Sequence, residues 1–176
     1  MLIEETVTYL EMTSADQLVP GRPPSAPVEM EALDRGSAPL LRSTYARIAA
    51  PHSWISRSAW SDEQWAEWLN SPTVQAWLAR VGDEVVGMVE LQVQSGGDVE
   101  IVILGLVPEF VGKGLGGHLL TVATRLAWEA KSPDGTFTTR VWLHTSSRDH
   151  PHAKRNYEHR GFRPFRTEER QREVPG

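Results

Sequence analysis

The spacing of apolar side chains changes several times along the chain of 176 residues, and each change predicts an element. Residues 5 to 12 alternate with a period of two, which predicts an edge strand. Residues 38 to 49 carry apolar side chains at helical spacing, and a second helix is expected from residue 61, where Ser61 and Gln64 have the spacing of a capping box. Residues 17 to 27 lie between the first strand and these two helices. They hold four of the 12 prolines, which predicts an extended connector.

The next part of the sequence predicts an antiparallel meander. Residues 74 to 81, 84 to 94 and 99 to 107 are strand-like runs, and glycine-containing turns at 82–83 and 95–98 separate them. Turns of this composition join antiparallel hairpins. The third run is rich in Val, Ile and Leu, as expected for a strand that is buried on both faces.

The third run of the meander is followed by a helix and then another strand. Apolar residues recur at helical spacing after residue 116, and residues 140 to 145 form the next strand-like run. A right-handed crossover between the two strands would make them parallel neighbours. Pro151 and Gly161 bracket a short helix, residues 163 to 166 predict a final edge strand, and we expect a frayed polar tail from residue 167.

Between the strand at 99 to 107 and its helix lies a glycine-dense turn. Glycine allows sharp turns and close approach of a ligand to the backbone. The first N–H groups of a helix lack intrahelical partners and lie at the positive end of its dipole, which suits a phosphate or pyrophosphate. The alternative to a phosphate-binding loop is an ordinary glycine-rich turn that binds no ligand. The glycines of the turn are Gly112, Gly114, Gly116 and Gly117.

The spacing of these glycines restricts the ligand. The pattern GxxxxGK[ST] is absent, and Asp134, near the place of a dinucleotide-binding acidic residue, lies in a Ser-Pro-Asp-Gly turn. Residues 111 to 116, VGKGLG, resemble the Q/R-x-x-G-x-G/A loop of the GNAT superfamily of acyltransferases, which binds the pyrophosphate of coenzyme A. Residues 104 to 110, LGLVPEF, are similar to its L-x-V-x-P-x-Y lead-in. Val111 departs from the usual Arg or Gln.

A second block of sequence supports the same resemblance. Residues 149 to 162 are similar to the superfamily signature N-x-x-A-x-x-x-Y-E-x-x-G-F, although His150 stands where Asn is usual. The matching residues are Ala153, Tyr157, Glu158, Gly161 and Phe162. The resemblance implies an α/β fold of the α+β type, in which a mixed sheet of about six to seven strands is flanked by about four helices. An antiparallel meander would precede a parallel pair that splays around the coenzyme A site.

The resemblance also implies a domain organisation and a set of cofactor contacts. Residues 1 to 176 would form one domain: an acidic strand and connector to 36, a helical acceptor-side region at 37–70, a coenzyme-binding core at 74–166 and a polar tail. The pantetheine arm of acetyl-CoA, the cosubstrate, would pair with the backbone of Leu106 and Val107. The Leu106 N–H would polarise the thioester carbonyl. The other expected cofactor contacts are Val111, Gly112, Lys113, Gly114, Leu115, Gly116 and His150.

Acyl transfer to an amine needs a base for the amine and an acid for the departing thiolate. Tyr157 occupies the place of the superfamily's thiolate acid, and a structural tyrosine that holds the coenzyme is the alternative. Glu100 is our candidate base, because a carboxylate in an apolar strand often has a raised pKa. An exposed, inert Glu100 is equally compatible with the sequence, and Glu90 or a chain of water molecules could replace it.

The acceptor pocket is predicted from the loop between the first two helices. In the GNAT layout this loop borders the acceptor, and here residues 51 to 57 contain His52 and Trp54. We expect these two side chains to contact substrate. Trp65 and Trp68 lie at helical spacing and are expected to pack the second helix.

Composition excludes several classes of function. The net charge of −5 and the pI of about 5.7 make nucleic acid an unlikely partner. The chain has no cysteine, and His144, His150 and His152, without a nearby carboxylate motif, are weak support for a metal site, so we expect no metal. No apolar run is long enough to span a membrane and the start is acidic, which predicts a cytoplasmic protein without a membrane partner. A homodimer is compatible with the fold.

The sequence is compatible with two functions. The first is an acyl-CoA-dependent N-acetyltransferase that moves an acetyl or short acyl group to a primary amine, on a small molecule or a peptide, by direct attack. The second is a noncatalytic acyl-CoA-binding regulatory or scaffold module, which the replacements at Val111 and His150 would permit.

Overall fold

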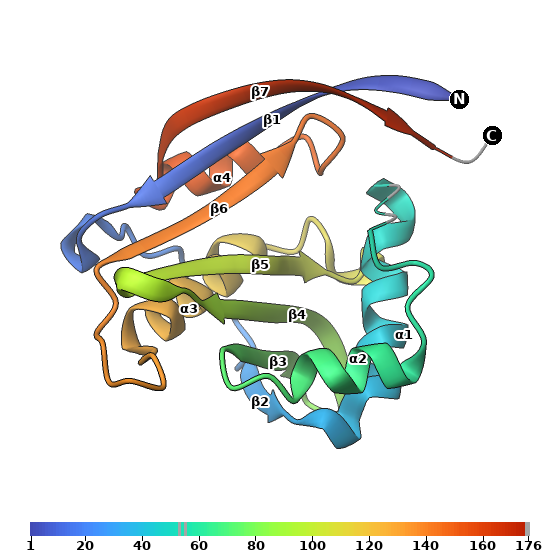
Figure 1. Cartoon of the computed structure of the whole chain (residues 1–176), viewed down its shortest axis with the longest axis horizontal. Helices are drawn as coiled ribbons and strands as arrows, with labels where there is room; N and C mark the ends of the chain where they lie inside the picture. Colours follow the sequence, from blue (N-terminus) through green and yellow to red (C-terminus); the bar gives the residue numbers. More distant parts are fainter. Residues whose placement is uncertain (53, 55, 175–176) are drawn as a thin grey trace.

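The structure is a computed structural model that describes residues 1 to 52, 54 and 56 to 174. Ser53 and Ile55, in the loop expected to border the acceptor, lie outside the described residues. A single seven-stranded sheet has the order β2-β3-β4-β5-β6-β1-β7 (Figure 1). The strands are β1 (Leu2–Met12), β2 (Glu29–Leu33), β3 (Val74–Val81), β4 (Glu84–Val93), β5 (Asp98–Leu106), β6 (Arg140–Ser146) and β7 (Arg163–Glu173).

The described residues also form four α-helices, so the mixed α/β architecture predicted from the sequence is confirmed. They are α1 (Ala38–Ala49), α2 (Asp62–Leu69), α3 (Gly116–Glu129) and α4 (Ala153–His159). The bounds of α1 and β3 are those that the hydrophobic pattern predicts. The predicted capping box of α2 is present, because Ser61 Oγ accepts from the Gln64 N–H and the Gln64 side chain accepts from the Ser61 N–H.

Two expectations about the strands are wrong, and one further strand was not predicted from the sequence. β1 is not an edge strand, because it pairs with β6 on one side and β7 on the other. The segment from Thr167 is not a frayed tail, since β7 continues to Glu173 and pairs with β1 along that length. β2 was not expected at all, and it forms the other edge of the sheet against β3. These pairings join segments far apart in the sequence, which local periodicity does not report.

The parallel pair β5 and β6 is present and splays apart. The strands pair only at their first residues, where Asp98, Val99 and Glu100 face Arg140, Val141 and Trp142. Beyond this point β6 rises with β1 and β7, whereas β5 stays with β4, as Figure 1 shows. The backbone of the second half of β5 is therefore free on the side that faces β6.

A β-bulge in β5 determines which side chains face the opening. Glu90 of β4 faces Ile103 and Leu91 faces Ile101, so Val102 is an extra residue in β5. Before the bulge, Ile101 packs in the core under α3, whereas Ile103 packs in the core under α1 and α2. The bulge thus reverses the two faces of the strand midway along it.

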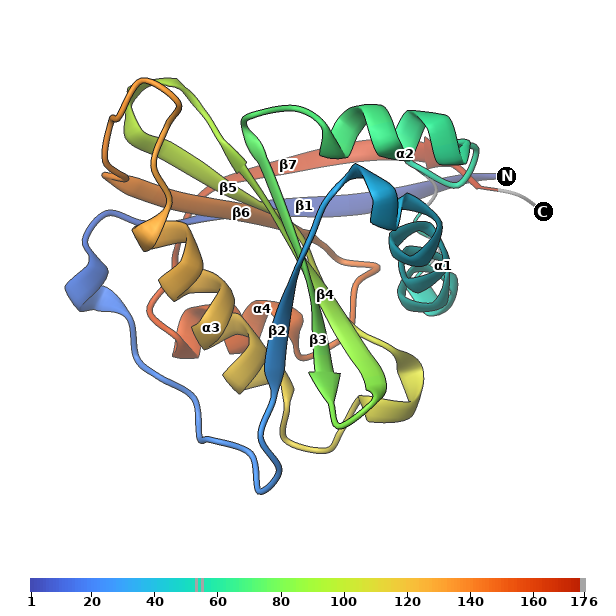
Figure 2. The ribbon, with the colours of Figure 1, turned by 90° about the horizontal axis from the view of Figure 1, so that it is seen from below.

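The helices cover both faces of the sheet (Figure 2). α3 packs on one face and α1 with α2 on the other. Contact between α1 and β5 is close, because a Cβ on Gly105 would lie 2.5 Å from Ile48 Cγ2.

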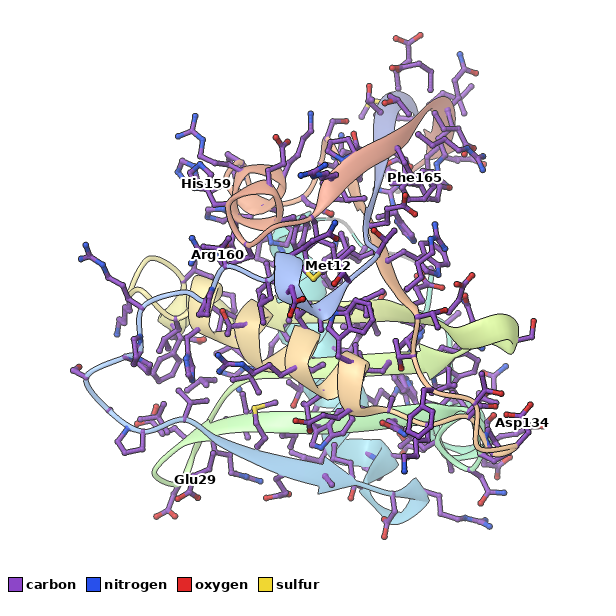
Figure 3. The ribbon with its side chains drawn as sticks, turned by 90° about the vertical axis from the view of Figure 1, so that its left-hand side faces the viewer. Met12, Glu29, Asp134, His159, Arg160 and Phe165 are labelled. Atoms are coloured by element: carbon purple, nitrogen blue, oxygen red, sulfur yellow. The ribbon has the colours of Figure 1, made fainter. Side chains whose placement is uncertain are left out.

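The proline-rich connector is fixed to α3 and α4. The Gly21 N–H donates to Thr121 Oγ1 at 2.8 Å, and the Val19 N–H donates to the Arg160 carbonyl at 2.9 Å. Figure 3 shows Arg160 at the end of α4, close to this connector, with Met12 nearby at the end of β1. A Cβ on Gly21 would lie 2.6 Å from the Gly117 carbonyl carbon, so only glycine fits against the first turn of α3.

Candidate active site

Two cavities meet in the opening between β5 and β6. The first, here called the glycine cavity, has a volume of about 410 Å3 and is lined by the loop before α3 and by α4. The second, the arginine cavity, has a volume of about 470 Å3 and is lined by β1, β5, β6, β7 and the loop after α1. Trp54, Leu104, Asp149 and Tyr157 line both cavities. A group that passes from one cavity to the other must pass these four side chains.

The loop before α3 forms an open cradle of backbone donors. Gly112 and Gly114 have φ of 81° and 78°, a region that favours glycine, and a Cβ at either position would meet no atom within 4 Å. Within the described residues, the N–H groups from 112 to 118 have no hydrogen-bond acceptor. The cradle therefore fits the pyrophosphate of acyl-CoA, an anion that accepts several N–H bonds.

The other expected contacts of this loop divide into two groups. Val111, Gly116 and His150 line the glycine cavity. Lys113 and Leu115 do not: the Lys113 ammonium lies 5.1 Å from the centre of the Phe110 ring, and Leu115 is buried.

Leu106 and Val107 differ in the direction of their backbone groups. The Val107 N–H donates to the Val86 carbonyl at 2.9 Å, and the Val107 carbonyl accepts from the Phe110 N–H at 2.9 Å. Both backbone groups of Val107 thus already have a partner within the chain, and the pairing of a pantetheine arm with Leu106 and Val107 stays a prediction. Successive N–H groups of a strand point to opposite sides, so the Leu106 N–H points away from β4, toward the opening and the glycine cavity.

Tyr157 occupies the junction of the two cavities. Its ring packs against Phe162 at the end of α4, with 6.4 Å between centroids, and its hydroxyl has no hydrogen-bond partner among the described residues. Burial raises the pKa of the phenol, and the nearby Asp149 carboxylate raises it further. The phenol is thus protonated at neutral pH and can donate a hydrogen bond into the junction.

A hydrogen bond closes the junction from the side of α1. Trp54 Nε1 donates to Asp149 Oδ1 at 2.8 Å, while Asp149 Oδ2 accepts from Thr145 Oγ1 and the Ser146 N–H at 2.8 and 3.0 Å. Trp54 lines both cavities and His52 lines only the glycine cavity, and contact of either side chain with substrate stays a prediction. Asp149 was missed as a site residue, because its partner lies 95 positions away in the sequence.

Glu100 lies behind the wall of the arginine cavity and not in it. Gln94 Nε2 donates to Glu100 Oε1 at 3.2 Å, and Oε2 lies 3.9 Å from Nε2 of His144, which does line the cavity. Burial raises the pKa of Glu100. Burial also lowers the pKa of His144, with the Arg170 charge adding to the effect. A neutral imidazole therefore separates the Glu100 carboxylate from the cavity.

Glu90, the alternative base, is held in a buried ion pair. Its carboxylate is fully buried and accepts from both terminal nitrogens of Arg57, at 2.9 and 2.6 Å, and from Trp68 Nε1 at 2.7 Å. The Arg57 guanidinium also lies about 5 Å from the ring centres of Trp60, Trp65 and Trp68. Three hydrogen bonds hold this fully buried carboxylate in the cluster, and Glu90 lines neither cavity. The expected packing roles of Trp65 and Trp68 agree with this arrangement.

Comparison with known proteins identifies the family. Residues 41–162 match the family described as "Acetyltransferase (GNAT) family". The chain belongs to the GNAT acetyltransferase family. No curated protein matches this GNAT chain, and its likeness to solved structures is one of fold.

Among the solved structures, a GCN5-related N-acetyltransferase from Sphaerobacter thermophilus has a TM-score of 0.70 at 15% identity, over 98% of this GNAT chain and 53% of that one. A GCN5-related N-acetyltransferase from Kribbella flavida has a TM-score of 0.65 at 20% identity, and the match covers 99% of this chain and 60% of that one. An aminoglycoside acetyltransferase from an uncultured soil metagenomic sample, in complex with sisomicin, has a TM-score of 0.59 at 16% identity, over 75% and 86%. The chain thus spans little more than half the length of the first two.

Two further observations concern the described part of this GNAT chain. No group of three or more His, Asp or Glu side chains there is arranged to hold a metal ion. None of its described helices combines the length and the apolar character needed to cross a membrane.

The cradle gives a first testable prediction. Gly114→Ala is expected to weaken acyl-CoA binding at least tenfold, because a Cβ strains a positive-φ backbone and enters the space of the ligand. Gly82→Ala is the matched control, since Gly82 has φ of 58° in the β3–β4 turn, with open space around it and no part in either cavity. Isothermal titration with acetyl-CoA measures both, and equal dissociation constants for the two variants would contradict the role of the cradle.

Proposed function

We propose that the chain is an N-acyltransferase that moves an acetyl or short acyl group from acyl-CoA to a primary amine. Family membership supports acyl transfer. The observation that carries the rest is the junction of the cavities at Tyr157, with the cradle on one side and the arginine cavity on the other. Acyl-CoA would enter the glycine cavity, and the amine would approach through the arginine cavity.

The residues at the junction suit direct attack of the amine on the thioester. The amine nitrogen forms a bond to the carbonyl carbon, and the developing oxyanion accepts the Leu106 N–H. The nitrogen then loses a proton to the pair formed by His144 and Glu100. The carbon–sulfur bond breaks, and the thiolate takes the phenolic proton of Tyr157, which solvent restores.

Release of free thiol tests this function. Mixing the protein with acetyl-CoA and a panel of primary amines is expected to release CoA only when an accepted amine is present. The thermal midpoint is expected to rise with acetyl-CoA and with CoA but not with NAD, because a ligand that binds only the native state stabilises it. A raised midpoint without thiol release for any amine would favour a noncatalytic acyl-CoA-binding module.

The pH dependence of the same reaction tests the base. The base acts when deprotonated, so kcat/KM is expected to rise with pH through the pKa of Glu100, which burial places above that of an ordinary carboxyl group. In Glu100→Gln the rise of kcat/KM at acidic pH should disappear and kcat/KM should fall. The second rise, at alkaline pH, comes from deprotonation of the amine substrate and should remain. An unaltered pH–rate profile in Glu100→Gln would exclude Glu100 as part of the base.

A further inference from the structure

Arginine side chains gather on the wall of the arginine cavity that β1 and β7 form. Glu5 of β1 lies directly opposite Arg170 of β7, and Ile3 lies opposite Arg172. Alternate residues of a strand share one face, so Arg170, Arg172 and Glu5 point to the same side of the sheet. All three charged residues line the cavity.

Glu5 only partly satisfies the two arginines. Its Oε1 lies 3.6 Å from Arg170 Nε and 3.8 Å from Arg172 Nε, longer than a hydrogen bond. Its Oε2 is occupied by the Ser146 hydroxyl at 2.6 Å. The Arg172 Nε is buried without a hydrogen-bond partner, and neither guanidinium donates a hydrogen bond to another described residue. One buried carboxylate thus faces two cations whose donors are free.

Two other arginines on this face are paired more fully. Arg140 donates to Glu11 at 2.6 Å and to Asp98 at 3.3 Å, so it has two carboxylates of its own. Arg166 donates to Glu168 at 2.8 Å. Arg170 and Arg172 thus differ from Arg140 and Arg166, because no carboxylate oxygen lies within hydrogen-bond distance of either of them.

The remaining charged groups of the cavity are engaged with partners of their own. Arg57 is neutralised by Glu90 through two hydrogen bonds. Asp149, the other carboxylate of the wall, has both oxygens occupied by Trp54, Thr145 and Ser146. His144 is neutral at neutral pH. The charges of Arg170 and Arg172 are thus balanced by Glu5 and Asp149, and what the cavity offers to a ligand is the set of N–H donors on the two guanidinium groups that no described residue accepts from.

We propose that the arginine cavity selects an acceptor amine that also carries a carboxylate, and that Arg170 and Arg172 bind this carboxylate while the amine reaches the junction at Tyr157. A guanidinium binds a carboxylate through two parallel, charge-assisted hydrogen bonds. A volume of about 470 Å3 is typical of a small-molecule site. This inference rests on the proposed function only for the fate of the amine, because carboxylate binding itself needs no reaction.

Binding in the presence of free CoA tests the proposal without turnover. The probes are the common L-amino acids, β-alanine and γ-aminobutyrate, each paired with its carboxamide, titrated by calorimetry in chloride buffer. At least one acid is expected to bind tenfold or more tightly than its amide. Equal affinity of acid and amide throughout, or no binding by any acid of the set, would overturn the proposal.

Variants locate the carboxylate. Arg172→Gln and Arg170→Gln are each expected to weaken binding of the preferred acid about 10- to 100-fold, the scale of a charge-assisted hydrogen-bonded pair, and to leave amide binding unchanged. Each keeps the other arginine beside Glu5, which favours retention of the fold. Arg166→Gln is the matched control, since Arg166 lies on the same strand, pairs with Glu168 and lines neither cavity. Equal loss for acid and amide in the Arg170 and Arg172 variants would contradict the assignment.

Thiol release with the same pairs separates the two proposals. The preferred acid should have the higher kcat/KM, even though the amine of an amide is less basic and so more often deprotonated. Binding of the acid without thiol release would contradict the N-acyltransferase function and leave the carboxylate site established. Thiol release from amides as fast as from acids would contradict the carboxylate site and leave the function established.

Discussion

Replacement of Tyr157 by phenylalanine is expected to lower kcat about 100- to 10,000-fold, the range that a general acid contributes, while acetyl-CoA binds as before. The phenol is held protonated by burial at the junction of the two cavities, and phenylalanine keeps its packing against Phe162 but cannot supply the proton. Steady-state thiol release gives kcat, and isothermal titration gives the dissociation constant of acetyl-CoA.

The matched control for this variant is Tyr9→Phe. The Tyr9 hydroxyl donates to Glu168 at 3.2 Å on the outer part of the sheet, and Tyr9 lines neither cavity. Its removal should change kcat less than twofold. If Tyr157→Phe turned over at the rate of the unaltered protein, Tyr157 would be a structural residue and another group would protonate the thiolate.

Glu90→Gln is expected to lower the free energy of unfolding by about 3–5 kcal/mol, the usual cost of leaving one member of a buried ion pair without its counter-ion. Arg57 would keep its charge among three indole rings but lose a carboxylate that accepts from both of its terminal nitrogens. Denaturant unfolding of the variant and the unaltered protein measures the difference.

An exposed ion pair of the same sheet is the control. Arg80 and Glu31 join β3 and β2 at 2.9 Å, with their side chains 25% and 47% exposed, and Glu31→Gln should cost less than about 1 kcal/mol. A similar, small loss in both glutamate variants would show that the Arg57–Glu90 pair does not stabilise the fold.

The parts of the molecule that follow from the sequence are those fixed by neighbouring residues. The helical spacing of apolar residues determines α1, and the glycine turn before α3 depends on conformations that few other residues adopt. Tyr157 is predicted from a contiguous block of matching sequence, and the structure places it at the junction of the two cavities. Trp54 is predicted from its place in the chain after α1, and it lines both cavities.

The parts that did not follow depend on which distant segments meet. Whether Glu90 is a base or a structural anion is decided by Arg57, which lies 33 positions earlier in the chain. Whether the Val107 N–H is available is decided by Val86 on the neighbouring strand. Glu5 and Arg170 become neighbours only when β1 pairs with β7. No local pattern of hydrophobic positions specifies these pairings.

The position of β1 between β6 and β7 also constrains the order of assembly. β3, β4 and β5 pair through short hairpins and can associate as soon as they are synthesised, whereas β1 must wait for partners that most of the chain separates from it. Until β6 and β7 emerge from the ribosome, β1 has unpaired backbone on both sides, a form prone to wrong pairing. The cradle before α3 can therefore exist on a nascent chain that still lacks the arginine cavity, so the two halves of the site are completed at different times.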